Sequence, residues 1–579
     1  MNPNSSTSTK TGAYWTRPLV RQQLRGAFAG DRRISSAEFR DLEETASTSG
    51  VPLEHLLVDS GHIPEEDVLK VLSDITALPV VNLAEAGIDR NIVAQIAPRI
   101  AAQSNVMPVR LEAGILLLGT DNVREVTEED RLRLLVNHPV GWLLCTRADI
   151  RESINHYYGI GLKSFLGLTG SRDAEGGMEE PGGEVEMQRV DIPGFIDEML
   201  SEAVCAEATD IHVEPYEEDL RIRFRIDGSL STVSLPDGIK ECDRAIVSGL
   251  KVLGQMNIAE HRLPQDGRFT FEENEHSYDI RMSVLPTPHG EAVNLRILNR
   301  VTTFLTIEDL GLRPDQRDTF DRLVQRPHGI ILFAGPTGSG KTTSLYAALE
   351  SLNMEDRKIV TIEDPVEYQI HGITQLHVRP DIGFTFASGL RSILRHDPDV
   401  VLVGEIRDPE TASIATSAAL TGHLVFSTLH TNDAVSSITR LIDMGIEPYL
   451  VSSSVEGVIA QRLVRRLCMR CREPRTLSRS VLEKIPDLCP GGTADGTFYT
   501  HRGCPHCRFT GFRGRRAIFE ILSMDGELMS RAASRAPTHE LMDVALRQGL
   551  KTLRSSGWKL AREGQTTIEE VMRVTREEI

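Results

Sequence analysis

Hydrophobic and polar positions follow helical spacing in the first part of the chain. From about Ser35 to Tyr158, apolar residues recur three or four positions apart, as in Ile63–Leu72, and short strand-like runs lie between these segments. The pattern predicts a small α/β domain over residues 35–160. We expect a disordered tail over residues 1–34 before it.

Strict alternation appears in the next domain, which we place at residues 189–300. Leu220–Ile226 carries four apolar side chains at every second position and three arginines between them, and the turn pair Asp227-Gly228 follows. This pattern predicts a half-buried strand with a basic face. The arginines are either solvated or functional, and the alternation alone does not decide between these alternatives.

Short continuous apolar runs alternate with helical segments from about Val301 onward. Gly329–Ala334 and Val400–Val403 are typical of strands buried on both faces. Strands that alternate with helices predict a parallel sheet with crossover helices. We therefore expect a multidomain α/β protein whose largest domain, residues 301–460, is built on such a sheet.

The segment between Thr169 and Gln188 has a different composition. It contains five Gly, six acids and one Arg, and so it cannot bury enough apolar surface to become ordered. We predict a flexible acidic linker over residues 161–188.

Charge and hydropathy exclude several classes of function. The 64 Lys and Arg against 83 Asp and Glu give a net charge of −19, which disfavours direct binding of nucleic acid. No apolar run approaches the ~20 residues that span a bilayer. The N-terminus lacks a basic region followed by an apolar one, so we see no secretory signal and expect the cytoplasm as the site of action.

A glycine-rich loop between a strand and a helix is the most specific feature of the sequence. The loop has the Walker A pattern and follows the apolar run that ends at Ala334. Its backbone N–H groups are suited to cradle phosphates, Lys341 supplies charge to the β and γ phosphates, and Thr342 offers a hydroxyl to Mg²⁺. The ATP-binding residues that we predict are Gly335, Pro336, Thr337, Gly338, Ser339, Gly340, Lys341, Thr342 and Thr343.

Candidate carboxylates follow two other predicted strands. Glu405 comes after Val400–Val403, where it holds the magnesium ion or is a surface carboxylate. Glu363, Asp364 and Glu367 follow another β-type run. Ligands gather at the carboxyl ends of parallel strands, so one of these three carboxylates is a candidate to orient or deprotonate the attacking water.

Four cysteines form two Cys-x-x-Cys pairs that predict a metal site. Cys468 and Cys471 form the first pair, Cys504 and Cys507 form the second, and 32 residues lie between the two pairs. Four thiolates suit a tetrahedral structural zinc site, and a redox dithiol pair is the alternative. We place this site in a zinc-binding and C-terminal helical region, residues 461–579.

Taken in order, these segments resemble the secretion ATPases of type II secretion and type IV pilus assembly. The resemblance extends from about Leu53 to Thr575. It rests on the Walker A loop, the two cysteine pairs, and the segments Ala208–Tyr216, Arg262–Arg268, Thr361–Glu367, Leu390–Asp408 and Thr421–Ala434.

The resemblance implies a hexameric ring ATPase that uses ATP, Mg²⁺ and Zn²⁺. Each subunit would carry a mobile N-terminal domain, a PAS-like α+β second domain and a RecA-like motor domain with a zinc-bearing extension. The N-terminal domain would dock onto inner-membrane platform proteins, so the protein would be cytoplasmic and peripheral to the inner membrane.

The resemblance also assigns roles to individual residues. It makes Glu363 the catalytic glutamate, Glu405 the Walker B acid that binds magnesium with Thr342, and His430 the centre of a histidine box. Arg268 and Arg281 would reach the nucleotide from the second domain.

The C-terminal segment Gly564–Val574 looks more like the secretion branch of this family. We therefore expect a motor for pseudopilus assembly and protein export. A pilus-extension ATPase is the first alternative, and a DNA-directed RecA-like motor and a nucleotide-regulated scaffold are weaker ones. Some relatives bind cyclic di-GMP through an Arg-Leu-Gly motif, but Pro52-Leu53-Glu54 stands there and Ile75 replaces a later glutamine. We therefore favour partner docking over cyclic di-GMP binding.

Overall fold

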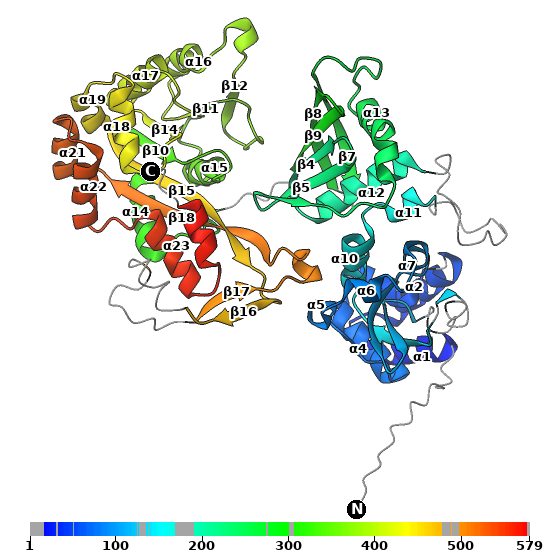
Figure 1. The fold of residues 1–579 in the computed structure, drawn as a ribbon. Helices are drawn as coiled ribbons and strands as arrows, with labels where there is room; N and C mark the ends of the chain where they lie inside the picture. Colours follow the sequence, from blue (N-terminus) through cyan, green and yellow to red (C-terminus); the bar gives the residue numbers. More distant parts are fainter. Residues whose placement is uncertain are drawn as a thin grey trace, which may run out of the picture. The chain divides into compact units, whose positions relative to one another are not determined.

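The computed structural model describes residues 17–29, 33–49, 51–123, 126, 132, 135–136, 138–167, 190–273, 276–299, 306–477, 488 and 497–575. These residues form two compact units (Figure 1). The first unit comprises residues 1–298 and 502–511, and the second comprises residues 299–501 and 512–579.

The first unit begins with a group of four helices. They are α1 (Arg17–Phe28), α2 (Ser36–Ser49), α3 (Leu53–Asp59) and α4 (Glu65–Thr76). Our prediction of a disordered tail through residue 34 was wrong for α1. Val20, Leu24 and Phe28 recur every four residues, so they share one face of α1 and are buried in the same cluster as residues of α2 and α4. The expected tail residues 1–16 lie outside the described residues.

A small three-stranded sheet follows these helices. It has the order β1-β2-β3, formed by Val106–Glu112, Ile115–Thr120 and Val140–Leu144. Around it are α5 (Leu83–Ala86), α6 (Arg90–Val93), α7 (Pro98–Ser104), α10 (Arg147–Tyr158) and α11 (Leu162–Phe165). Leu162 and Phe165 are buried, so folded structure continues beyond the predicted boundary at residue 160. Residues 168–188 of the predicted linker lie outside the described residues.

The second domain is a six-stranded sheet with two long helices. The sheet order is β6-β5-β4-β9-β8-β7, and its strands are β4 (Ala208–Pro215), β5 (Leu220–Ile226), β6 (Ser229–Thr232), β7 (Gln265–Glu273), β8 (His276–Thr287) and β9 (Gly290–Asn299). The helices are α12 (Ile192–Cys205) and α13 (Asp243–Leu253), preceded by the 3-10 turn η2 (Ile239–Cys242). Apolar side chains of both helices and of the sheet share one core, so one sheet face is buried and the other is polar. The predicted alternation of β5 is confirmed.

The second unit is built on a seven-stranded sheet of order β12-β11-β13-β14-β10-β15-β18. The neighbouring strands from β12 to β15 run parallel, and only β18 is antiparallel to its neighbour. The strands are β10 (Gly329–Ala334), β11 (Ile359–Glu363), β12 (Thr374–His377), β13 (Val400–Val403), β14 (Leu424–Leu429), β15 (Val455–Leu467) and β18 (Phe512–Ser523). The predicted parallel sheet is confirmed.

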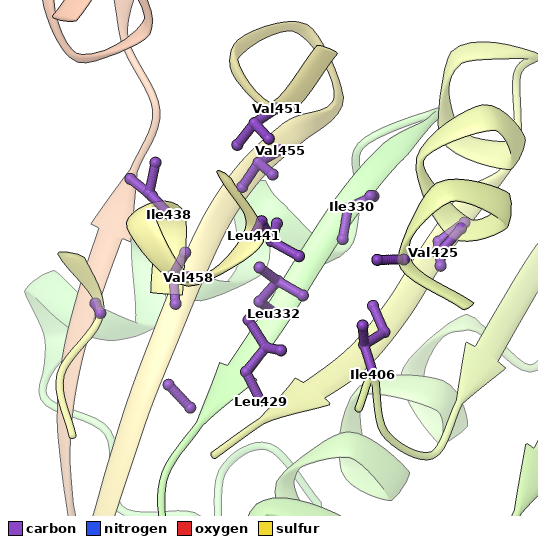
Figure 2. Packing of buried hydrophobic residues seen from close by; sticks show 14 of the residues in the cluster. Ile330, Leu332, Ile406, Val425, Leu429, Ile438, Leu441, Val451, Val455 and Val458 are labelled. Atoms are coloured by element: carbon purple, nitrogen blue, oxygen red, sulfur yellow. The ribbon is translucent and has the colours of Figure 1, made fainter. Parts of the chain in front are cut away.

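Helices cover both faces of this sheet. On one face lie α14 (Pro314–Val324) and α15 (Lys341–Leu352), and on the other lie α16 (Phe386–Ile393), α17 (Pro409–Leu420), α18 (Val435–Asp443) and α19 (Pro448–Ser454). Figure 2 shows the second face, where Ile330 and Leu332 of β10 pack beside Val455 and Val458 of β15. Ile331, between the two β10 residues, is buried on the α15 face.

The predicted boundary at residue 460 cuts through a strand and was wrong. β15 continues to Leu467 and pairs with β18, so both strands belong to the motor sheet rather than to a separate extension. Further elements of the described residues are the antiparallel pair β16 (Arg472–Arg475) and β17 (Phe498–His501), helices α21 (Gly526–Ala533), α22 (Thr538–Arg547), α23 (Leu553–Arg562) and α24 (Ile568–Val574), and the 3-10 turns η3 (Pro380–Ile382), η4 (Leu394–His396) and η6 (Pro505–Cys507).

Within the described part of the chain, no helix is both long and apolar enough to cross a bilayer.

Candidate active site

The glycine-rich loop lies where the sequence predicts it, between β10 and the N-terminus of α15. Gly340 has a φ of +86°, and a Cβ atom on it would lie 2.8 Å from the Gln461 amide nitrogen. Only glycine fits this conformation and this space without strain. The loop can therefore turn its backbone N–H groups toward a phosphate at the positive end of the α15 dipole.

Lys341 begins α15 and is 9% exposed. Its Nζ donates hydrogen bonds to the carbonyl oxygens of Gly335 at 2.7 Å and Pro336 at 3.0 Å. Burial, helped by the positive charge of Arg462, lowers the pKa of Lys341 to about 8, and Glu405 acts in the opposite direction. The ammonium group is thus held against the loop without an adjacent carboxylate among the described residues, as a phosphate-binding lysine requires.

Glu363 is the last residue of β11 and is buried, whereas Asp364 and Glu367 are exposed. This difference favours Glu363 among the three carboxylates that the sequence offered. One of its oxygens accepts hydrogen bonds from Thr361 Oγ1 at 2.6 Å and Gln375 Nε2 at 3.3 Å. The other oxygen accepts a short hydrogen bond from the Tyr346 hydroxyl. The carboxylate is therefore fixed by three donors at the carboxyl end of its strand.

The Tyr346 hydroxyl is one of these three donors. Burial and the charge of Glu363 both raise the pKa of Tyr346, so the phenol remains a donor at physiological pH. Tyr346 lies on α15, 17 positions before Glu363 in the sequence. Neither Tyr346 nor Gln375 was predicted as a site residue, because only the fold brings them to the end of β11.

Glu405 follows β13, and its side chain is 12% exposed. Its Oε2 lies 2.6 Å from Arg407 Nε and 3.3 Å from His430 Nε2. His430 follows β14 and is 46% exposed. Because β13 and β14 are neighbours in a parallel sheet, Glu405 and His430 share one edge with the glycine loop. Thr342, the other predicted magnesium ligand, is half-buried in the first turn of α15.

Arg268 and Arg281 lie in the second domain, on β7 and β8, as direct cross-strand partners. They line an open cavity of ≈ 630 Å³ together with Arg296 of β9. Arg296 pairs with Asp210 at 3.0 Å. Within the described part of the chain, neither Arg268 nor Arg281 has a carboxylate within 4.0 Å. Two like charges directly opposite each other are unfavourable. Asp266 and Asp279 also line the cavity, so its lining contains three arginines and two carboxylates.

The four predicted zinc ligands come together. Their sulfur atoms all lie within 4.8 Å of one another, and all four side chains are buried. Cys504 Sγ and Cys507 Sγ are 3.6 Å apart, far longer than a disulfide and close to the ~3.8 Å edge of a tetrahedron with 2.3 Å Zn–S bonds. None of the four forms a disulfide. The donor set therefore fits a structural zinc ion, and it leaves no coordination position for a substrate.

Comparison with known proteins agrees with this geometry. Residues 186–573 match the family described as Type II/IV secretion system protein, and residues 76–163 match the MshEN domain. The type IV pilus assembly ATPase PilB of Myxococcus xanthus is 39% identical over 565 residues, which cover 96% of this chain and 97% of the relative. The type II secretion system protein E of Xanthomonas campestris pv. campestris is 37% identical over 561 residues, which cover 94% and 97%.

Two further similarities are less complete. The PilB protein of Thermus thermophilus is 39% identical over 540 residues, covering 91% of this chain but only 59% of the relative. The X-ray structure of the Legionella pneumophila ATPase DotB aligns with 66% of this chain and 95% of its own, at 21% identity and a TM-score of 0.49. The assignment therefore rests on the sequence matches together with the site. The chain belongs to the Type II/IV secretion system protein family and is a secretion ATPase related to both type II secretion ATPases and type IV pilus assembly ATPases.

Proposed function

We propose that this chain hydrolyses ATP as a homo-hexamer at the cytoplasmic face of the inner membrane and drives pseudopilus assembly and protein export in type II secretion. Type IV pilus assembly is the second candidate, because relatives with both names align over nearly the whole chain. The observation that carries the ATPase function is the glycine loop with Lys341, which lies at the same edge of the parallel sheet as Glu363 and Glu405.

The motor residues would divide the chemistry among them. Lys341 would leave the loop carbonyls and bind the terminal phosphates of ATP, where its full charge is restored. Thr342 and Glu405 would hold magnesium and its water shell, and the ion would neutralise charge on the phosphates. Glu363 would orient the attacking water and accept its proton, since three donors keep the carboxylate in place.

Phosphate release would be reported by His430. Its contact with Glu405 ties the loop after β14 to the carboxylate that holds magnesium. A change in the charge around Glu405 would therefore change its contact with the half-exposed His430 side chain.

Arg268 and Arg281 would bind the nucleotide when the second domain closes onto the motor domain of the same subunit. Support comes from the cross-strand arginine pair, which lacks a carboxylate partner among the described residues. Arginine contacts with a transferring phosphate stabilise charge in the transition state.

Zinc would be held by Cys468, Cys471, Cys504 and Cys507, where it would stabilise the fold rather than take part in hydrolysis. The N-terminal domain would dock onto an inner-membrane platform protein. Support for this role is the separate match of residues 76–163 to the MshEN domain.

ATP hydrolysis by purified protein, with Lys341→Ala and Glu363→Gln variants, tests the mechanism. Both variants should lose turnover, but Glu363→Gln should still bind ATP because the phosphate cradle is intact. Glu367→Gln is the matched control, since this exposed carboxylate lies four positions further along the same loop. Near-wild-type hydrolysis by Lys341→Ala or Glu363→Gln would refute the assigned roles.

Identification of the membrane partner tests the choice between the two systems. The chain should co-purify from its own host with the platform protein of a type II secretion system, and its deletion should block export of secreted proteins. Loss of pili with normal protein export would select the pilus-assembly function instead.

A further inference from the structure

Arg462 lies on β15 directly beside the glycine loop. β10 and β15 run parallel, and Ala334, the last residue before the loop, pairs with Ala460. Figure 2 shows the two strands side by side through Ile330, Leu332, Val455 and Val458. A Cβ atom on Gly335 would lie 3.0 Å from Arg462 Nη1. The guanidinium group therefore lies against the first glycine of the loop.

The charge of Arg462 is buried and has only neutral partners in direct contact. Its side chain is 9% exposed. It donates to the Gln461 carbonyl oxygen at 3.2 Å, and to Asn432 O at 2.9 Å and Asn432 Oδ1 at 3.3 Å. Among the described residues, no carboxylate lies within 4.0 Å of it, and Asp433 and Glu520 act on it only from further away. Burial of a cation among neutral partners costs desolvation free energy, and an anionic ligand offsets this cost.

Lys341 is the second cation at the same loop residue. Its Nζ donates to the Gly335 carbonyl oxygen at 2.7 Å, while Arg462 lies beside the Gly335 Cα. The hydroxyl of Ser339 is also buried there and has no hydrogen-bond partner among the described residues. Lys341, Arg462 and the Ser339 hydroxyl thus surround Gly335. An anion with several negative charges suits this arrangement, because it can accept hydrogen bonds from all three groups.

We propose that Arg462 is a phosphate-binding residue of the ATP site, supplied by β15 of the same subunit, which contacts the phosphate chain together with Lys341. The proposal rests on the assignment of this pocket to ATP. Arg462 exchanges its neutral acceptors for phosphate oxygens when the nucleotide binds. One of those acceptors is Asn432, which lies two residues after His430. The exchange therefore also changes the contacts of the segment that follows β14 and contains His430.

Inorganic tripolyphosphate is the probe that tests this contact, since it has the charge of the phosphate chain without the base or ribose. Its affinity is measured on the full chain by displacement of a fluorescent ATP analogue and by the rise in melting temperature. Arg462→Gln loses the charge but keeps an amide that can donate to Asn432. We expect it to weaken tripolyphosphate and ATP binding by about 10- to 100-fold, with a smaller effect on AMP. Arg462→Lys keeps the charge and should retain most of the affinity.

Controls separate this role from a structural one. Arg440→Met removes an exposed arginine of the same unit and should leave tripolyphosphate binding unchanged. Asn432→Ala removes the side-chain acceptor but leaves Arg462, so its affinity for tripolyphosphate should stay within about threefold of wild type. If Arg462 only held the histidine loop, Asn432→Ala would lose affinity and Arg462→Gln would not.

Each outcome decides something. Wild-type affinity in Arg462→Gln, or an equal loss for AMP and tripolyphosphate, would overturn the proposal while ATP binding by the wild type stands. If Arg462→Gln does not fold, Asn432→Ala decides, and a large loss of affinity in that variant overturns the proposal. Failure of the wild-type chain to bind ATP would instead refute the proposed function.

Discussion

Tyr346→Phe is the sharpest test of how Glu363, the proposed catalytic carboxylate, is held. Tyr346 is 2% exposed and Glu363 is 4% exposed, so water does not readily replace the lost hydroxyl. The phenylalanine ring fills the same space, and the substitution removes one donor to Glu363 Oε2. Thr361 and Gln375 still donate to the other oxygen. The experiment therefore isolates a single hydrogen bond.

The expected size follows from the charge of the acceptor. A hydrogen bond to a charged group contributes ~1.5–3 kcal/mol, so we expect the free energy of unfolding of the motor domain to fall by about 2 kcal/mol. For a domain of roughly 150–250 residues, each kcal/mol lowers the melting temperature by ~2–4 °C, which gives a decrease of roughly 4–8 °C. Calorimetry of the apo protein measures this decrease.

Turnover should fall more than ATP binding. If the lost bond is what orients Glu363 toward the attacking water, ~2 kcal/mol corresponds to a decrease in kcat of about 10- to 30-fold, with the Kd for ATP changed less than about twofold. Tyr449→Phe, an exposed tyrosine of the same unit, is the matched control. In a Glu363→Gln background, Tyr346→Phe should cost little further activity. An unchanged or higher kcat in the single variant would show that Tyr346 does not position Glu363 for catalysis.

Further predictions concern the lysine, the metal and the second domain. Lys341 must be charged to attract phosphate, and its pKa is about 8. ATP affinity should therefore be constant below pH 8 and fall by up to about tenfold per pH unit above it. Lys341→Arg should show no such decrease when ATP affinity is measured by isothermal titration calorimetry. Cys468→Ser with Cys471→Ser should release about one zinc ion per chain, measured by elemental analysis, and lower the melting temperature; a zinc-free wild type contradicts the site. Arg281→Ala should lower turnover by about 10³- to 10⁵-fold and affinity far less. Mixed rings of Lys341→Ala and Arg281→Ala subunits should stay inactive, and recovered activity would show that the arginine acts across subunits.

The phosphate cradle could be predicted from sequence because its chemistry is local. Nine consecutive residues from Gly335 carry the glycines, the lysine and the hydroxyls, so spacing alone specifies the loop. The position of Glu405 after a buried strand could be predicted in the same way, from an apolar run. The alternation in Leu220–Ile226 also sufficed to predict a half-buried strand, since burial on one face is a property of neighbouring residues.

Residues that act through the fold could not be predicted in this way. Tyr346 occupies an apolar position of α15, and nothing near it in the sequence indicates that its hydroxyl meets a carboxylate. Arg462 lies on a long strand whose neighbour, β10, is more than a hundred residues away, so its contact with the glycine loop depends on strand order. The predicted domain boundary at residue 460 was wrong for a related reason. It falls within β15, and the amino-acid composition of that strand does not change at residue 460.

Strand β15 connects the nucleotide pocket to the cysteine cluster through one continuous stretch of backbone. Its 13 residues extend for about 40 Å at ~3.3 Å each, and β18 supports it along most of that length. Arg462 lies partway along, and Cys468 follows the last residue, about 20 Å beyond it. Cys468 therefore ties the end of the strand that carries Arg462 to the cysteine cluster.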